Sequence, residues 1–427
     1  MKRGILACLC IFAVMFLSGC GESAPLVILV DIQTEMGVSE RDVLVVTNEI
    51  EQKLKACGGP EDIEFITLPS GGSEREIEVE RLRTEIMSGQ GPDIFIVNLN
   101  KTGEELFPIA EKGMEQGMFL DLDPYLQNAR FMDWDALTPV VMEAGKNAQG
   151  QQLLPMTYTF PVTYYDDAAV TDTPSATLTW TDMLEDNTGI LRNAASPVYS
   201  AEGISISSPF GGFLGSFGEL ADYANATLLF TEEMMWQRLE ETAALYQQTN
   251  AGEFADLPLH HKGSISVGYD DLWGKLITGS LPEASEVEIV PQYNNVGGVT
   301  AVVTSFIGIN RNTERPEDAF FIADYLMSSS AQQELKLYER LFLNASVPTH
   351  EALMQQTYPI GGWSMSENNY SEFSAARDVV TQARFCGELD RTLGKLFYEW
   401  YAAESTGEDT ESLVAEAYET MQLRLQE

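Results

Sequence analysis

Basic side chains are scarce in this 427-residue sequence, which has 25 Lys and Arg residues against 65 Asp and Glu residues. The formal net charge of −40 disfavours nucleic acid and anionic ligands as partners, because the chain would repel both. The acidic residues are spread along the chain instead of being collected in one tail. This distribution is typical of a solvated protein surface.

The motifs of common enzymes are also missing. The sequence has no G-x-S-x-G, S-x-x-K, H-E-x-x-H or Walker loop. Its three histidines are His260, His261 and His350. The adjacent pair cannot easily present both rings to one metal ion, and no third ligand has recognisable spacing. We therefore expect no metal, no cofactor and no catalysis. A glycan hydrolase with two carboxylates stays as a remote alternative, because acidic residues are abundant.

Long apolar runs are absent after the first twenty residues, so no later stretch approaches the roughly 20 apolar residues of a membrane span. The start of the chain has Lys2 and Arg3, an apolar run over 5–17, and then Leu-Ser-Gly-Cys ending at Cys20. This pattern predicts a signal peptide over 1–19. Its end resembles the bacterial lipobox, which implies a lipid on Cys20 and a tether over 20–25.

Cysteine is rare in the rest of the chain, where only Cys57 and Cys386 remain. The two could form one disulfide, or they could be unpaired buried residues. They do not have the Cys-X-X-Cys spacing of a redox motif, so the sequence leaves both alternatives open.

The segment 82–97, LRTEIMSGQGPDIFIV, is the most regular part of the chain. Val79, Leu82 and Ile86 fall on one helical face. Gly89, Gly91 and Pro92 then predict a turn, and 94–97 predicts a short buried strand. Upstream, strands are expected at 26–30 and 63–68, and helices at 39–54 and 75–87. This alternation predicts an α/β fold with a parallel sheet.

The helix–Gly-Pro-Asp–strand unit resembles that of the extracellular solute-binding proteins of ABC importers, the family that includes maltose- and multiple-sugar-binding proteins. Further segments match the family in order and spacing. They are 117–126 (GMFLDLDPYL), 150–166 (GQQLLPMTYTFPVTYYD), 179–184 (TWTDML), 262–275 (KGSISVGYDDLWGK), 309–332 and 344–348 (NASVP).

The resemblance implies a two-lobed periplasmic-binding-protein-like fold of type II, with open, mostly parallel sheets and three chain crossings. The sequence shows no repeat and no low-complexity linker, which suits two lobes that share one chain. We expect 26–158 plus 308–345 in the N-terminal lobe. The C-terminal lobe would contain 159–307 plus 346–427.

A cleft between the lobes is expected to hold the ligand, because open α/β sheets bind ligands at the carboxyl ends of their strands. Aromatic rings stack on the apolar faces of sugars, while carboxylate and amide groups bind sugar hydroxyls. By position, the ligand-binding candidates are Gln33, Thr34, Asn98, Asn100, Tyr158, Thr159, Phe210, Tyr269, Trp273, Trp363 and Phe385.

The resemblance therefore implies a monomeric, lipid-anchored protein on the extracellular face of a bacterial membrane. It would bind a sugar or oligosaccharide and deliver it to a membrane permease. Another neutral or cationic solute, such as a polyamine or a peptide, is the main alternative ligand. A lipoprotein that senses its ligand for a membrane partner would have the same sequence features.

Overall fold

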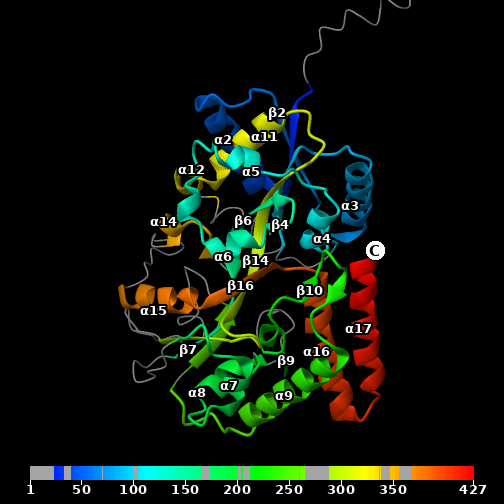
Figure 1. Ribbon diagram of the computed structural model, residues 1–427, viewed down its shortest axis with the longest axis vertical. Helices are drawn as coiled ribbons and strands as arrows, with labels where there is room; N and C mark the ends of the chain where they lie inside the picture. Colours follow the sequence, from blue (N-terminus) through cyan, green and yellow to red (C-terminus); the bar gives the residue numbers. More distant parts are fainter. Residues whose placement is uncertain are drawn as a thin grey trace, which may run out of the picture.

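The protein has two lobes arranged along its long axis (Figure 1). The computed structural model describes residues 24–32, 40–69, 71–99, 104–165, 174–197, 199–200, 203–204, 212–258, 260–264, 288–335, 337, 347–354 and 367–427.

The upper lobe is built on the predicted βαβαβ unit. Its elements are β1 (Leu26–Asp31), α2 (Glu40–Ala56), β2 (Ile63–Thr67), α3 (Gly72–Met87) and β3 (Ile94–Asn98). Both β2 and β3 pair with β1 in parallel, which confirms the prediction from the alternating pattern. Parallel strands need helical crossovers on the sheet faces, and α2 and α3 provide them.

The turn after α3 explains its two glycines. Gly89 and Gly91 have φ values of 81° and 91°, a region that side chains with a Cβ rarely adopt. The predicted helical face is confirmed, since Val79, Leu82 and Ile86 are all buried. Local sequence therefore determines both the packing of α3 and the start of β3.

Asp93, the acidic residue of the Gly-Pro-Asp turn, has a structural role. Its carboxylate accepts hydrogen bonds from the Val27 backbone N–H at 2.8 Å and from the Thr313 hydroxyl at 2.6 Å. Its carbonyl accepts from the Asn310 N–H at 2.8 Å. Asp93 thus joins the turn before β3 to β1 and to the segment that contains Asn310 and Thr313.

Strand β14 (Val299–Ile309) runs through both lobes (Figure 1). Its upper part lies between β3 and β6 (Leu153–Thr159), antiparallel to both. Its lower part pairs in parallel with β16 (Val380–Phe385). The short strand β15 (Val347–Pro348) pairs with β6, so the strand order is β15-β6-β14-β3-β1-β2.

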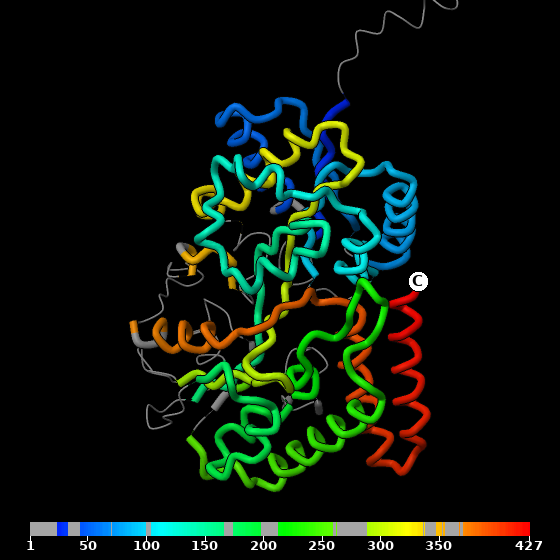
Figure 2. Tube along the Cα trace, in the orientation of Figure 1, coloured from blue at the N-terminus to red at the C-terminus, as the bar shows by residue number. Residues whose placement is uncertain are grey.

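The lower lobe has a second sheet of β12 (His260–Ser264), β7 (Pro161–Tyr165) and β13 (Glu288–Pro291), with β7 in the centre. Because β7 follows β6 after one residue, the chain passes directly from the first sheet into the second. Figure 2 shows this crossing beside β14.

Helices cover both lobes (Figure 1). In the upper lobe they are α4 (Ala110–Glu115), α5 (Asp123–Leu126), α6 (Pro139–Glu143), α11 (Pro316–Met327), α12 (Ser329–Leu335) and α14 (Glu351–Met354). In the lower lobe they are α7 (Trp180–Glu185), α8 (Ile190–Ala195), α9 (Glu232–Asn250), α15 (Glu367–Asp378), α16 (Glu388–Thr406) and α17 (Glu411–Gln426). The remaining short strands are β4 (Lys146–Asn147), β5 (Gly150–Gln151), β8 (Tyr199–Ser200), β9 (Gly203–Ile204), β10 (Ala221–Asp222) and β11 (Thr227–Leu228).

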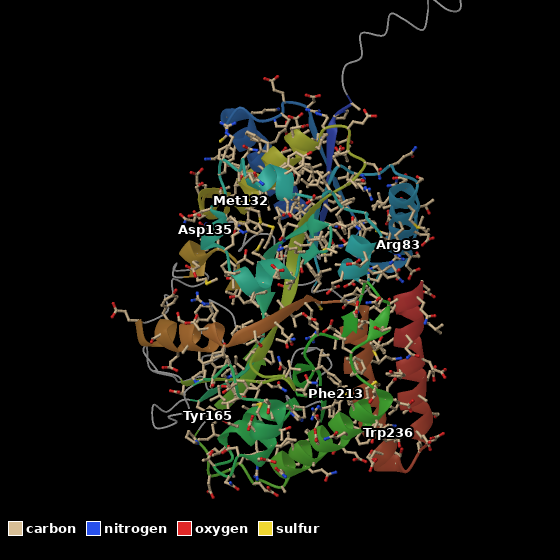
Figure 3. The ribbon with its side chains drawn as sticks, in the orientation of Figure 1. Arg83, Met132, Asp135, Tyr165, Phe213 and Trp236 are labelled. Atoms are coloured by element: carbon tan, nitrogen blue, oxygen red, sulfur yellow. The ribbon has the colours of Figure 1, made fainter. Side chains whose placement is uncertain are left out.

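Two tryptophans of the lower lobe are packed in its interior, and the indole N–H of Trp180 has a hydrogen-bond partner. Trp180 is fully buried, and its indole N–H donates to Glu241 at 2.7 Å. Thr179 caps α7, where its hydroxyl and the Asp182 carboxylate each accept a backbone N–H. Figure 3 shows Trp236 on α9 in this lobe, where its ring packs edge-on against another indole. These tryptophans are packing residues.

Cys57 and Cys386 are both free thiols, so the disulfide alternative is not realised. Cys57 is half-buried and Cys386 is buried. Burial raises the pKa of the Cys386 thiol well above its usual value, which keeps the thiol protonated and unreactive. In the part of the chain that the structure describes, no helix has the length and apolar character to cross a membrane.

Candidate functional site

The carboxyl ends of strands from both lobes meet at one short stretch of β14. From above, β3 ends at Asn98 opposite Ser305, and the Leu99 N–H donates to the Thr304 carbonyl at 2.7 Å. From below, β16 ends at Phe385 opposite Val303. Loops that leave strand ends of an open α/β sheet are where ligands bind, and here two such ends face each other.

The opposite edge of this stretch is formed by β6. The Thr157 hydroxyl lies 2.8 Å from that of Thr304 and 2.5 Å from that of Ser305, and all three side chains are buried. Tyr158 and Thr159 continue the strand toward the lower lobe, opposite the central part of β14. The junction of the lobes is therefore lined by uncharged hydroxyl groups.

Two further strands of the lower lobe end at the same level. Ser264, the last residue of β12, lies opposite Pro161, and the Gln292 N–H after β13 donates to the Pro161 carbonyl at 3.0 Å. The buried Gln292 side chain also forms two hydrogen bonds with the backbone of Gly212. Its oxygen accepts from the Gly212 N–H, and its nitrogen donates to the Gly212 carbonyl. An amide thus fixes the loop that follows Gly212 next to the crossing.

A buried ion pair stabilises the upper-lobe side of the junction, at the carboxyl end of β1. Asp31 ends β1, and its two carboxylate oxygens accept from the Arg75 guanidinium at 3.0 and 3.1 Å. The same guanidinium donates to the carbonyls of Pro69 at 2.9 Å and Glu104 at 2.7 Å. One side chain of α3 therefore neutralises the Asp31 carboxylate and joins the end of β1 to backbone that follows β2 and β3.

Four predicted site residues come together in this region. Asn98, Tyr158, Thr159 and Phe385 surround Val303–Ser305 of β14, and each is at most 3% exposed. They are buried side chains at the junction of the lobes. Burial raises the pKa of the Tyr158 hydroxyl to about 12, because desolvation penalises the phenolate.

The other sequence-predicted positions lie outside the described residues. They are Gln33, Thr34, Asn100, Phe210, Tyr269, Trp273 and Trp363, together with the lipidation candidate Cys20.

The structure adds four polar residues that the sequence reasoning missed, namely Thr157, Gln292, Thr304 and Ser305. A signal was present for two of them. Thr304 and Ser305 lie in the middle of a largely apolar strand, where buried hydroxyls need partners. Metal binding has no support in the described ranges, which contain no group of three or more His, Cys, Asp or Glu side chains placed to hold an ion.

The model of one protein family, described as bacterial extracellular solute-binding protein, matches residues 48–333. The chain belongs to this family. The match covers the upper lobe from α2, the crossing through β6 and β7, and the chain to α12. Members are solute-binding proteins that work outside the cytoplasm with ABC permeases.

Solved structures show the same fold at low sequence identity. An extracellular solute-binding protein family 1 member from Alicyclobacillus acidocaldarius is 16% identical, with a TM-score of 0.55 over 95% of this chain and 100% of that one. A periplasmic oligogalacturonide-binding protein from Yersinia enterocolitica is 13% identical, with a TM-score of 0.59 over 94% and 99%.

A third solved structure, a de novo designed cysteine esterase, is 13% identical, with a TM-score of 0.59 over 95% of this chain and 99% of that one. A search of curated protein sequences gives no significant match.

Proposed function

We propose that this family member is a lipid-anchored solute receptor of an ABC importer, which binds a sugar or oligosaccharide between its lobes and catalyses no reaction. The observation that carries the proposal is the meeting of β3, β12, β13 and β16 ends from both lobes at one crossing. A ligand that contacts both lobes stabilises one lobe arrangement, and that arrangement is what a permease would recognise.

Neutral, hydroxyl-rich ligands suit this junction better than charged ones. Its buried polar groups include threonine and serine hydroxyls and the Asn98 amide, and the buried Asp31 carboxylate of the upper lobe is matched by Arg75. Sugars need such hydrogen-bonding groups together with aromatic faces, which Trp273 and Tyr269 would supply. In this proposal the lobes comprise 26–158 plus 308–345 and 159–307 plus 346–427, except that β15 and α14 pack on the upper lobe and belong to the first.

A cationic solute is the second candidate, because the net charge of −40 would attract it. A thermal-shift screen of the chain from Gly21 onward separates the candidates, using oligosaccharides, polyamines and short peptides. Binding to the folded state alone stabilises by about 2.7 kcal/mol at a hundredfold excess over Kd.

We expect stabilisation by one class of sugar, with the sugar unchanged in the mixture. Stabilisation by a polyamine or peptide alone would contradict the sugar proposal while keeping the receptor proposal. Consumption of a glycan would instead show a hydrolase.

Replacing Trp273 with alanine is expected to weaken binding of the stabilising sugar about tenfold or more, because the indole face packs against the sugar ring. Isothermal titration of the wild type and the variant checks this. Trp236→Phe, a change to a packing residue of α9, serves as the matched control and should leave Kd within about twofold. Equal affinity of Trp273→Ala and the wild type would remove Trp273 from the site.

A further inference from the structure

The segment 104–109, which leads into α4, reaches from the upper lobe to the start of α16 in the lower one. Two nitrogens of Arg391 donate to the two carboxylate oxygens of Glu105, both at 2.6 Å. The Glu388 N–H donates to the Pro108 carbonyl at 2.8 Å. Figure 1 shows α4 directly above the ends of these helices. This set of contacts forms an interlobe tie.

The tie continues through α4 itself. Lys112 donates to the backbone carbonyl of Arg424, near the end of α17, at 2.9 Å. Glu111 projects inward, where its carboxylate accepts the backbone N–H of Phe385 at 2.9 Å. Phe385 ends β16, so Glu111 connects the upper lobe to the strand that meets β14 from below.

Arg83 of α3 supports the tie from above. Its guanidinium donates to the Glu105 and Leu106 carbonyls and forms an ion pair with Glu104 at 2.7 Å. Figure 3 shows Arg83 at this side of the upper lobe, beside the end of the chain. The tie is therefore held rigidly against the upper lobe.

Arg384, the guanidinium that acts on Glu111, and the neighbouring Arg391 each have another carboxylate as partner. Arg384 pairs with Asp390 at 2.8 Å, and both side chains are buried. Arg391 pairs with Glu105. In the described part of the chain, Glu111 itself forms no ion pair, although it is only 8% exposed. Glu111 is thus a third carboxylate beside two arginines that already have carboxylate partners.

The remaining groups that face Glu111 do not supply a positive charge. The lower-lobe hairpin of β10 and β11 contributes Tyr223, whose pKa is held well above its usual value by burial and by Glu111 and Asp390. Cys386 contributes a buried neutral thiol. Glu219, near Tyr223, adds a further negative charge. Ionised Glu111 would therefore be an uncompensated charge in a dry interface.

We propose that Glu111 makes the interlobe tie sensitive to protons: the neutral carboxyl group holds α4 against β16, and ionisation loosens this contact. In the described residues the carboxylate accepts hydrogen bonds from two backbone N–H groups, that of Phe385 at 2.9 Å and its own. These donors suit a neutral acid, whereas a buried anion also needs a paired cation, which Glu111 lacks among these residues. Because the described tie lies at the junction of the lobes, their relative arrangement would respond to pH without any solute.

Burial raises the pKa of Glu111 to about 7, while an exposed glutamic acid titrates near 4.5. Between pH 4.5 and about pH 7, Glu111 is therefore protonated more often when the tie is closed than when it is open. By linkage, the opening equilibrium is lowest below about pH 4.5, rises by up to tenfold per pH unit, and levels off above about pH 7. The tie is thus strongest in mild acid.

Hydrogen exchange measured by mass spectrometry tests the proposal on the ligand-free chain from Gly21 onward. Glu111→Gln keeps an oxygen for the Phe385 N–H and removes the titrating group. At each pH between 5 and 7.5, the exchange rate of the wild type is divided by that of the variant, so that the intrinsic pH dependence cancels. Glu115→Gln, a change of the same kind at the end of α4, is the control.

We expect this ratio to rise by up to about tenfold per pH unit in peptides covering 104–115 and 383–392, and to stay constant in peptides covering 26–31 and 43–54. The Glu115→Gln ratio should not change with pH in either region. A constant ratio at 104–115 and 383–392 would overturn the proposal. A rise of equal size in all four regions would also overturn it, because Glu111 would then affect only global stability.

Discussion

Replacement of Arg75 by alanine is expected to lower the free energy of unfolding by about 3–5 kcal/mol, the cost of breaking a fully buried ion pair by removing one partner. The Asp31 carboxylate, which is 0% exposed, would lose the two guanidinium hydrogen bonds that stabilise it. The Pro69 and Glu104 carbonyls would lose a donor as well. Urea denaturation followed by circular dichroism measures the difference.

Arg81→Ala is the matched control, because Arg81 lies on the same helix and pairs with Glu78 and Glu85 at the surface. Exposed pairs contribute about 0.2–1 kcal/mol, so this variant should lose no more than about 1–2 kcal/mol. Similar losses for Arg75→Ala and Arg81→Ala would mean that the pair with Asp31 is solvated in solution.

The Arg75→Ala substitution also bears on the proposed ligand binding between the lobes. Arg75 joins the end of β1 to the backbone at Pro69 and Glu104, which follow β2 and β3. Sites are precise when the groups that orient them are locked by packing and hydrogen bonds. We infer that the backbone at the carboxyl ends of these strands depends on a single side chain of α3.

The local part of the fold could be predicted from the sequence. The β1–α2–β2–α3–β3 unit follows from periodicity and turn residues that lie close together in the chain, and the structure confirms each element. The apolar residues over 302–309 also favour a strand by local pattern, although β14 begins earlier, at Val299. The first three residues of β14 pair with β16, which lies about 80 residues further along the chain. Local sequence patterns carry no information on pairing between such distant strands.

The polar interactions at the junction could not be predicted in the same way. Glu105 and Arg391 are 286 residues apart in sequence, and Asp31 and Arg75 are 44 apart. In a chain with 65 acidic residues, no single carboxylate is distinguished by its local context. Burial and pairing decide which of them matter, and both arise only when distant strands and helices pack.

The second large effect is expected for Phe306, whose replacement by alanine should cost about 3–5 kcal/mol. Phe306 is fully buried on β14, where the two lobes meet. Its ring lies 6.1 Å from that of Phe107 and 6.3 Å from that of Phe119 in the upper lobe. On the other side it lies 5.4 Å from the ring of Phe385, at an angle of 83°.

This position makes Phe306 part of one hydrophobic core that continues from the upper lobe into the lower one. Alanine would leave a cavity between rings that belong to both lobes, and close-packed neighbours can collapse into it only partly. Phe306→Leu should restore most of the stability, because it refills much of the volume. Ile77→Ala, at an exposed site on α3, should change stability by less than about 0.5 kcal/mol. Chemical denaturation of the three variants measures these differences, and a loss below 1 kcal/mol for Phe306→Ala would show that the two lobes do not share this core in solution.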